Sequence, residues 1–213
     1  MKVRHIEWEN LRKGRELASR RLPHILAIPV IGSAREMLLR LIKKGDRLLD
    51  VGANDRNLEG FLAGRGVTVS YSSCDTDHSH HHDYYDLESV SQTFDIVTAF
   101  EVIEHMEPAH VAECFARVKR LIKEGGHFII STPNVCNPVV FWRDCSHVTP
   151  FRYDELYGLL HGAGFSDIRI YRCGSRRLRD RLLALYYRPL LRLMRMDFAT
   201  GIVAVAKNSP EKR

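Results

Sequence analysis

Three carboxylates and a glycine-containing loop in the first half of the chain are of the types that recognise a nucleoside. The loop Asp50-Val-Gly52-Ala-Asn54 follows a short apolar run, and Asp75 comes 25 positions after Asp50. Gly52 carries no side chain, so the backbone there can approach a ligand closely. An acidic residue about 20 positions after such a loop is what recognition of ribose hydroxyls needs. Asp86 can accept a hydrogen bond from an adenine amine. These residues predict an adenosine-containing ligand.

The charge around these residues indicates which adenosine ligand the site accepts. Asp55 and Asp77 add to the acidic set, and the chain lacks the Gly-Lys-Ser/Thr of a phosphate-binding P-loop. The net charge is +6 overall, but it is +7 over residues 1–47, −9 over 48–170 and +8 over 171–213. An acidic centre between basic ends favours a cationic ligand at the site and an anionic surface at the ends.

A second group of chemically capable residues lies in the stretch Phe141-Trp-Arg-Asp-Cys-Ser-His-Val-Thr-Pro150, shortly after Ser-Thr-Pro-Asn134. A hydroxyl that accepts a transferred group reacts faster beside a general base. His147 is our candidate for that base, because the ordinary pKa of imidazole lies near neutrality. Asp144 is the candidate to orient it. The alternative is a structural loop histidine bonded to backbone.

The segment Glu101-Val-Ile-Glu104-His105 offers a metal-binding alternative. Positions i, i+3 and i+4 share a helix face, so Glu101, Glu104 and His105 could hold a divalent metal with His147 as a fourth ligand. We favour the other interpretation, a helix N-terminus near the ligand, where carboxylates interact favourably with the helix dipole. The histidine-rich tract 78–82 also has a metal-binding composition, but its place in a polar loop favours a solvated segment.

Strand-like and helix-like segments alternate through the middle of the chain. Short apolar runs predict strands, and amphipathic segments closed by glycines predict helices. The expected strands are 47–51, 67–73, 94–100, 127–131, 166–172 and 202–206, and the expected helices are 58–63, 103–122 and 153–160. This alternation implies βαβ units. We predict an α/β fold with a Rossmann-like, doubly wound, mostly parallel sheet that binds ligands at the carboxyl ends of its strands.

In their order along the chain, these motifs resemble those of class I S-adenosylmethionine (SAM)-dependent methyltransferases. The resemblance rests on Asp50-Val-Gly-Ala-Asn54, Cys74-Asp75, Asp86-Leu87, Phe94-Asp-Ile-Val97, Glu101-Val-Ile-Glu-His105 and Ala163-Gly-Phe165. It implies a seven-stranded sheet whose last strand is antiparallel, with SAM as the cofactor. It also implies that Gly52 lies against the methionine part, Asp75 on the ribose and Asp86 near the adenine. The implied cofactor-binding residues are Asp50, Gly52, Asn54, Asp75, Asp86 and Glu101.

Asn54 departs from the pattern, because the family usually has a glycine there. Asparagine is one of the few other residues that tolerate a left-handed backbone, so we expect the loop to form. The resemblance covers about residues 45–173 and the closing strand 201–207, which we place with the rest in a single domain, 1–213. Residues 1–44 are expected to be a helical cover, with helices within 11–21 and 33–44 over the cofactor cleft.

Residues 174–200 are expected to be a basic amphipathic insertion. Seven arginines alternate with Leu, Tyr and Met over 176–196, a pattern typical of contact with an anionic membrane or with a phosphate backbone. The alternative is a lid or a dimer helix in a homodimer. Residues 1–16 have no apolar stretch, the apolar run 25–31 is too short to span a bilayer, and the five cysteines have no C-x-x-C. We therefore expect a cytoplasmic protein, peripheral at the inner face of the membrane.

The stretch Trp142-Arg-Asp-x-x-His147-Val-x-Pro-Phe151 resembles methyltransferases of bacterial surface-glycan synthesis. It implies methyl transfer to a sugar hydroxyl in a glycan or lipid-linked intermediate. Glu101 to His105 with the later His147 resembles small-RNA 2′-O-methyltransferases, which implies a divalent metal and an RNA or quinone-precursor hydroxyl instead. Nucleic acid is the less favoured partner, because the chain has no recognisable RNA-binding domain and no aromatic stacking platform. A catalytically inactive, methyltransferase-like binding subunit is a third interpretation.

Overall fold

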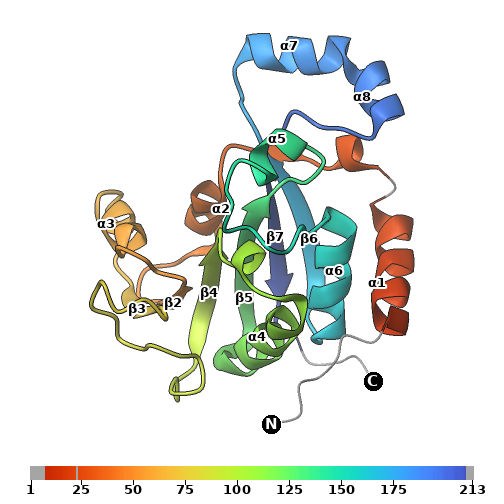
Figure 1. Cartoon of the computed structure of the whole chain (residues 1–213). Helices are drawn as coiled ribbons and strands as arrows, with labels where there is room; N and C mark the ends of the chain where they lie inside the picture. Colours follow the sequence, from red (N-terminus) through yellow and green to blue (C-terminus); the bar gives the residue numbers. More distant parts are fainter. Residues whose placement is uncertain (1–7, 23, 210–213) are drawn as a thin grey trace.

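The computed structural model describes residues 8–22 and 24–209, with side chains described from residue 12 onward. One seven-stranded sheet forms the centre of the molecule (Figure 1). Its strands are β1 (Val30–Ile31), β2 (Arg47–Val51), β3 (Ser70–Cys74), β4 (Phe94–Phe100), β5 (Ile122–Pro133), β6 (Ser166–Cys173) and β7 (Gly201–Lys207).

The strands lie in the order β1-β6-β7-β5-β4-β2-β3. β7 runs antiparallel to both β5 and β6, and the other neighbouring pairs are parallel. The predicted doubly wound, seven-stranded sheet with an antiparallel last strand is confirmed. The direction of winding reverses at β2, because β3 lies on one side of it and β4 on the other, and ligands bind beyond such a reversal in parallel sheets.

Helices cover both faces of the sheet, as the nearly continuous apolar strands require. On one face, α2 (Ala34–Leu41) and α3 (Asn57–Ala63) bury Met37, Leu38, Leu58 and Leu62 against the sheet. On the other face lie α1 (Trp8–Arg21), α4 (Pro108–Leu121) and α6 (Tyr153–Gly162). The hydrophobic core is therefore two clusters, one on each side of the sheet.

The N-terminal helix α1 lies beside α6 and not over the cleft (Figure 1). A Cβ atom added to Gly14 would lie 2.7 Å from the Cα of Gly158, so the two helix backbones meet closely at these glycines. Ala18, one turn further along α1, is fully buried. The expectation that a helix within 11–21 covers the cofactor cleft is wrong, because the small-residue face of α1 fits α6.

The helix predicted over 103–122 is two elements. A 3-10 helix, η2 (Ile103–His105), comes first, and α4 begins at Pro108. A proline disfavours the helical conformation in the residue before it and is well placed at the first turn of a helix. Glu107, just before Pro108, accordingly has an extended backbone with ψ 146°.

The apolar run 25–31 forms a 3-10 helix, η1 (Ile25–Ala27), followed by β1, a strand that the sequence analysis did not predict. Two residues are too few to show an alternating pattern. The predicted basic insertion contains α7 (Leu178–Tyr186) and α8 (Arg188–Met194), and a short helix, α5 (Pro138–Phe141), follows β5. Within the described residues, no helix combines the length and apolar character needed to cross a membrane.

Candidate active site

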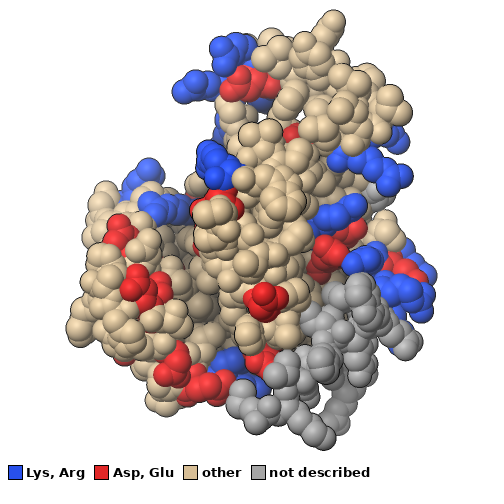
Figure 2. All heavy atoms as spheres, in the orientation of Figure 1, with Lys and Arg blue, Asp and Glu red and all other residues tan. Residues whose placement is uncertain are grey.

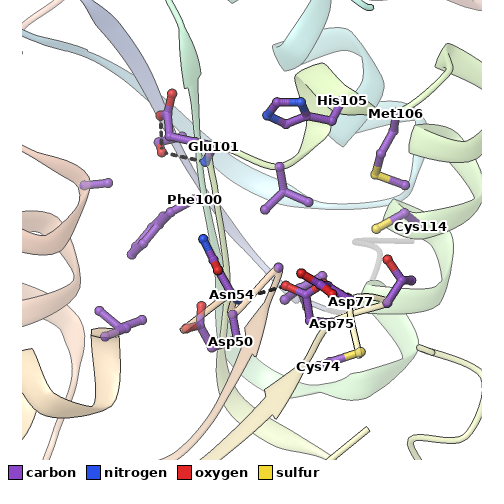
Figure 3. Close-up of a pocket in the computed structure, with 18 of the residues that line it drawn as sticks. Asp50, Asn54, Cys74, Asp75, Asp77, Phe100, Glu101, His105, Met106 and Cys114 are labelled. Atoms are coloured by element: carbon purple, nitrogen blue, oxygen red, sulfur yellow. Dashed lines mark hydrogen bonds between the residues drawn. The ribbon is translucent and has the colours of Figure 1, made fainter. Parts of the chain in front are cut away.

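A cavity of about 920 Å³ opens at the carboxyl ends of β2, β3 and β4, where the strand order reverses (Figure 3). Elements far apart in the sequence line it: the start of α2, the loop after β2, the turn after β3 and the segment after β4. All the residues that the sequence analysis assigned to the cofactor line this cavity, namely Asp50, Gly52, Asn54, Asp75, Asp86 and Glu101.

The loop after β2 takes the tight form that close approach of a ligand requires. Gly52 has a φ of 71° and its N–H donates to the carbonyl of Cys74 at the end of β3. Asn54 has a φ of 45°, so the asparagine occupies the left-handed region as expected. Its backbone N–H donates to Oδ2 of Asp75 at 2.8 Å, and the Asp77 N–H donates to Oδ1 of Asp75 at 3.0 Å. The Asp75 carboxylate therefore fixes both the loop after β2 and the turn after β3.

Asp50 lies beneath this loop, with only 5% of the residue exposed. Its carboxylate accepts hydrogen bonds from the Tyr71 hydroxyl at 2.8 Å and the Thr98 hydroxyl at 2.8 Å. Burial raises the pKa of Asp50 to about 6, although the two hydroxyls act in the opposite direction. Asp50 consequently changes charge close to neutral pH.

In the D50N variant, the free energy of unfolding should fall less with rising pH than it does in the parent chain. A carboxyl whose folded pKa is raised favours the folded state below its unfolded pKa, and this contribution is lost as the pH rises through about 6. Between pH 4 and pH 8, we expect the stability of D50N relative to the parent chain to rise by about 2 kcal/mol. Urea unfolding of both proteins at several pH values, without cofactor, measures this difference.

Asp95 provides a control of opposite sign. It is paired with Lys123 at 2.7 Å, and although burial acts to raise the pKa of Asp95, hydrogen bonds from Lys123 and from the Arg47 backbone hold it below its ordinary value. D95N should therefore lose stability near neutral pH and recover relative to the parent as the pH falls. Parallel pH profiles for D50N and the parent chain would contradict the assignment of Asp50.

Asp86 and Leu87 line the far part of the cavity, on the loop before β4. Oδ1 of Asp86 accepts the N–H of Ser89 at 2.7 Å, which closes the turn. Arg117 on α4 donates to the carbonyls of Leu87, Glu88 and Val90 at 2.8–3.0 Å. The sequence analysis missed this arginine, because nothing in a sequence shows which loop a helix arginine holds.

The analysis also missed apolar and N-terminal parts of the lining. Phe100, Val102, Met106 and Cys114 provide apolar surface, and Ser33 to Arg35 at the start of α2 complete the rim. Of the predicted N-terminal cover, α2 therefore does reach the cleft. Ser33 is the N-cap of α2, its hydroxyl accepting from the Glu36 N–H at 3.1 Å, and Ser-x-x-Glu was a readable signal for that helix start.

The stretch 141–150, which contains His147, is held next to the cavity by backbone hydrogen bonds. The N–H groups of Val148 and Thr149 donate to the carbonyl of Glu104 at 2.8 and 3.0 Å, and the Thr149 hydroxyl donates to the carbonyl of Met106 at 2.7 Å. These bonds place His147 next to His105, with ring centres 4.9 Å apart. His105 lines the cavity, and His147 lies behind it.

Asp144 does not orient His147 by a hydrogen bond. The nearest approach, from Nε2 of His147 to Oδ2 of Asp144, is 3.9 Å, and Oδ1 of Asp144 accepts from the backbone and hydroxyl of Ser146. Nδ1 of His147 instead lies 2.8 Å from the carbonyl oxygen of Phe141, to which it can only donate. The carbonyl therefore orients the ring and leaves Nε2 able to accept a proton.

The predicted four metal ligands are brought together only in part. Ligand atoms of Glu104, His105 and His147 lie within 4.8 Å of one another, and both carboxylate oxygens of the fully buried Glu104 have no hydrogen-bond partner among the described residues. Burial, and then the neighbouring Glu101 carboxylate, raise the pKa of Glu104. These three side chains fit a divalent metal through two imidazoles and a carboxylate.

Glu101 is not part of that group. Its φ of 55° takes it out of any helix, so the assumed shared helix face of Glu101 and Glu104 does not exist. Oε1 of Glu101 accepts from the Ser131 hydroxyl at 2.6 Å (Figure 3). Within the described residues, the tract 78–82 forms no such cluster either. Its last member, His82, is buried against Tyr85, so the expected solvated loop is only partly correct.

The acidic lining is suited to a positively charged adenosine compound. Carboxylates of Asp50, Asp75, Asp77, Asp86 and Glu101 surround the cavity, and among the residues lining it that the structure describes, Arg35 is the one arginine and there is no lysine. SAM carries a sulfonium and an ammonium, so the charges are complementary. The left-handed Gly52 gives the close backbone approach, and Asp75 offers the carboxylate for hydroxyl recognition.

Solved structures of methyltransferases share this fold. A SAM-dependent methyltransferase from Archaeoglobus fulgidus superposes with a TM-score of 0.63 at 18% identity, over 93% of this chain and 96% of the other. A SAM-dependent methyltransferase from Mesorhizobium loti gives 0.57 at 16% identity, over 83% and 98%. Phosphoethanolamine N-methyltransferase 2 of Haemonchus contortus, solved with SAM, gives 0.56 at 16% identity, over 83% of this chain and 52% of that protein.

In sequence, no curated protein matches the chain. Residues 28–170, which contain the cavity-lining loops and five of the seven strands in full, match the family described as "Methyltransferase domain". The match covers well over half of the chain. Together with the fold and the acidic cavity at the strand reversal, it shows that this chain belongs to the methyltransferase-domain family and is a class I SAM-dependent methyltransferase.

Proposed function

We propose that the protein transfers the methyl group of SAM to a hydroxyl oxygen of a sugar, in a surface glycan or a lipid-linked intermediate. The observation that carries the proposal is the 2.8 Å contact between Nδ1 of His147 and the carbonyl oxygen of Phe141. With Nδ1 donating to the carbonyl of Phe141, Nε2 of His147 has a free lone pair, and the ring lies beside His105, the member of the pair that lines the cavity. An oxygen acceptor needs such a base more than an amine does, because a hydroxyl must lose its proton as it reacts.

His105 supports the same chemistry. Its Nδ1 lies 3.2 Å from the carbonyl oxygen of Ser146, so its Nε2 can also face the cavity unprotonated. SAM supplies an electrophilic methyl group when bound. The acceptor oxygen forms a bond to that methyl carbon as the carbon–sulfur bond breaks, and the hydroxyl proton passes to an imidazole nitrogen of the histidine pair. Positioning of the acceptor supplies much of the remaining rate enhancement.

A carbohydrate acceptor is supported by the side chains next to His147. Trp142 is 76% exposed, directly after α5, and Arg143 and Asp144 beside it are also exposed. An exposed indole gives a flat apolar surface for the C–H face of a sugar ring and one N–H donor for its hydroxyls. Charged neighbours can then bond to the remaining hydroxyls.

His147→Ala should lower kcat by roughly 100-fold or more, because general base catalysis contributes about 10²–10⁴-fold. The affinity for SAM should not change, since His147 does not line the cavity. The assay follows transfer of labelled methyl from SAM to nucleotide sugars and lipid-linked saccharides, compared with RNA oligonucleotides and catechols. D144A is the control: it should change kcat little, and any loss of a bond to the acceptor should instead raise KM for the saccharide. Full turnover by H147A would contradict the assignment of His147 as the base. The assignment would also fail if the acidic limb of the pH–rate profile were lost in D144A as well as in H147A, because D144A retains the proposed base.

The second candidate function is metal-dependent methylation of an RNA 2′-hydroxyl or a quinone precursor. It is favoured by one observation, the buried carboxylate of Glu104 beside His105 and His147. This carboxylate has no hydrogen-bond partner of good geometry among the described residues, although the Thr132 hydroxyl and the Glu101 carboxylate are near enough to affect its pKa. In that case Glu104, His105 and His147 would hold a divalent cation, which would lower the pKa of the acceptor hydroxyl. The same assay separates the candidates, because EDTA would abolish metal-dependent turnover and leave general base catalysis intact.

A further inference from the structure

The helical hairpin formed by α7 and α8, with residues 174–200, stands apart from the sheet (Figure 1). Among its described residues, α7 buries none, and α8 buries only Leu191. A second cavity, of about 740 Å³, separates the hairpin from β1 and the end of β6. The side of α7 that carries Asp180, Leu183 and Ala184, with Tyr187 directly after the helix, lines this cavity and therefore faces the body of the protein.

The side of α7 that faces away from the body is apolar. Leu178, Leu182 and Leu185 follow the i, i+4, i+7 spacing of one helix face, and they are 70%, 56% and 63% exposed. In α8, Leu190, Leu193 and Met194 follow the i, i+3, i+4 spacing and are also exposed. A surface helix normally turns its polar side outward. Here both helices of the hairpin turn large apolar side chains outward.

The segment that carries this apolar surface is rich in arginine, although Arg176 and Arg181 line the inner cavity and Arg176 pairs with Glu36 at 2.8 Å. The hairpin segment 174–200 contains seven arginines, at 176, 177, 179, 181, 188, 192 and 195, against Asp180 and Asp197. Asp197 is buried and neutralised by Arg172 at 2.8 Å. Figure 2 shows the tan surface of the hairpin at the top of the molecule, with blue side chains at its edges. Long arginine side chains can keep their charge at the polar boundary while their neighbours enter an apolar phase.

We propose that the α7–α8 hairpin docks the protein onto an anionic lipid bilayer. The outward leucines and Met194 would enter the boundary between headgroups and acyl chains, and the arginines would meet lipid phosphates. Exposed apolar patches of this kind mark interaction surfaces in soluble proteins. The proposal concerns where the protein works, and it holds whichever hydroxyl the enzyme methylates.

Charge and side-chain type distinguish the bilayer from two other partners. A second copy of the hairpin would bring arginine-rich surfaces together, and like charges across an interface oppose association. RNA would satisfy the arginines, and Tyr186 and Phe198 are exposed nearby, but the outward faces of α7 and α8 are built from Leu178, Leu182, Leu185, Leu190, Leu193 and Met194, which cannot stack on bases as aromatic rings do. An anionic bilayer complements both the charge and the aliphatic surface.

Vesicle flotation of the full chain tests the proposal. The vesicles contain phosphatidylcholine alone or with 30% phosphatidylglycerol, and we expect at least tenfold stronger binding to the anionic ones, weakening as salt is raised. L182D/L185D/L193D should reduce binding at least tenfold. R179Q/R188Q/R192Q should reduce it roughly 100-fold, because each arginine near an anionic surface contributes about fivefold. SAM binding by each variant shows that it is folded.

The matched charge control is R12Q/R20Q/R21Q, which removes three arginines from α1. These positions are exposed, as positions 179, 188 and 192 are. This variant should retain vesicle binding. Equal losses in the two arginine triples, equal binding to neutral vesicles, or no vesicle binding would each overturn the proposal. So would a dimer, detected by light scattering, that needs the leucines, or RNA that binds the hairpin more tightly than the anionic vesicles do.

Discussion

Asp75→Ala should weaken SAM binding by roughly 100-fold. Asp75 performs two tasks at once: its oxygens accept the backbone N–H groups of Asn54 and Asp77, and it faces the cavity where a ribose is expected. Hydrogen bonds to a charged partner contribute about 1.5–3 kcal/mol, and each factor of ten in affinity corresponds to about 1.4 kcal/mol. Loss of the hydroxyl contact and loosening of the Gly52–Asn54 loop should therefore both lower the affinity.

Isothermal titration calorimetry with SAM measures this effect. D77A is the matched control, because Asp77 lines the same cavity but its carboxylate bonds only to Ser79 among the described residues. We expect D77A to bind SAM within about threefold of the parent chain. N54G should also bind normally, since glycine adopts the left-handed backbone of this position more easily than asparagine does. Unchanged affinity in D75A would overturn the assignment of this cavity to SAM.

Gly52→Ala should be among the most damaging single-methyl changes in the protein. Two costs add at this position: the φ of 71° is unfavourable for alanine, and the new Cβ would overlap Cγ2 of Val102 and lie 3.2 Å from its Cγ1. A left-handed non-glycine residue costs about 1–3 kcal/mol, and overpacking costs about 1–3 kcal/mol more. We expect G52A to lose about 2–6 kcal/mol of stability and to bind SAM poorly. Urea unfolding and calorimetry measure the two losses.

Two further variants separate the backbone cost from the overlap. Gly45 has a φ of 85°, but a Cβ there would meet no atom within 4 Å, so G45A should show the backbone cost alone. In G52A/V102A, the valine methyls are absent, and part of the stability should return. Because valine is stiff at χ1, simple rotation of its side chain is not expected to relieve the overlap. If G52A loses no more stability than G45A, the close contact with Val102 is not a constraint.

The sequence was sufficient for six of the seven strands and for the cofactor loops. Buried parallel strands need continuous apolar residues, so Arg47–Val51 and Phe94–Phe100 were predicted with their observed bounds. Asp50 lies near the end of β2, Gly52 and Asp75 directly follow β2 and β3, and Asp86 lies on the loop before β4; the carboxyl ends of parallel strands meet at one edge of the sheet. Local signals and a general rule of topology were therefore enough to bring these residues together.

Some wrong predictions could have been avoided, because the sequence contained a short-range signal against them. Pro108 marked the break between η2 and α4, yet the apolar pattern suggested one helix from residue 103. That mistake placed Glu101 on a helix face with Glu104, whereas its left-handed backbone sends it to Ser131. β1 could not be predicted in this way, because a two-residue strand exists only by pairing with β6.

The sequence by itself therefore determined the fold class, the family resemblance and the residues around the cofactor cavity. Only the tertiary structure decided which partner orients His147, which of the acidic residues joins the histidines, and which side of α7 faces outward. The partner of His147 is the carbonyl of Phe141, six positions away, and it depends on how the loop between them turns. The group of Glu104 with the histidines depends on contacts between segments 40 or more positions apart, such as Val148 with the carbonyl of Glu104, and the outward side of α7 depends on how that helix is rotated against the body. Such contacts are set by packing and backbone hydrogen bonding, which no short-range pattern records.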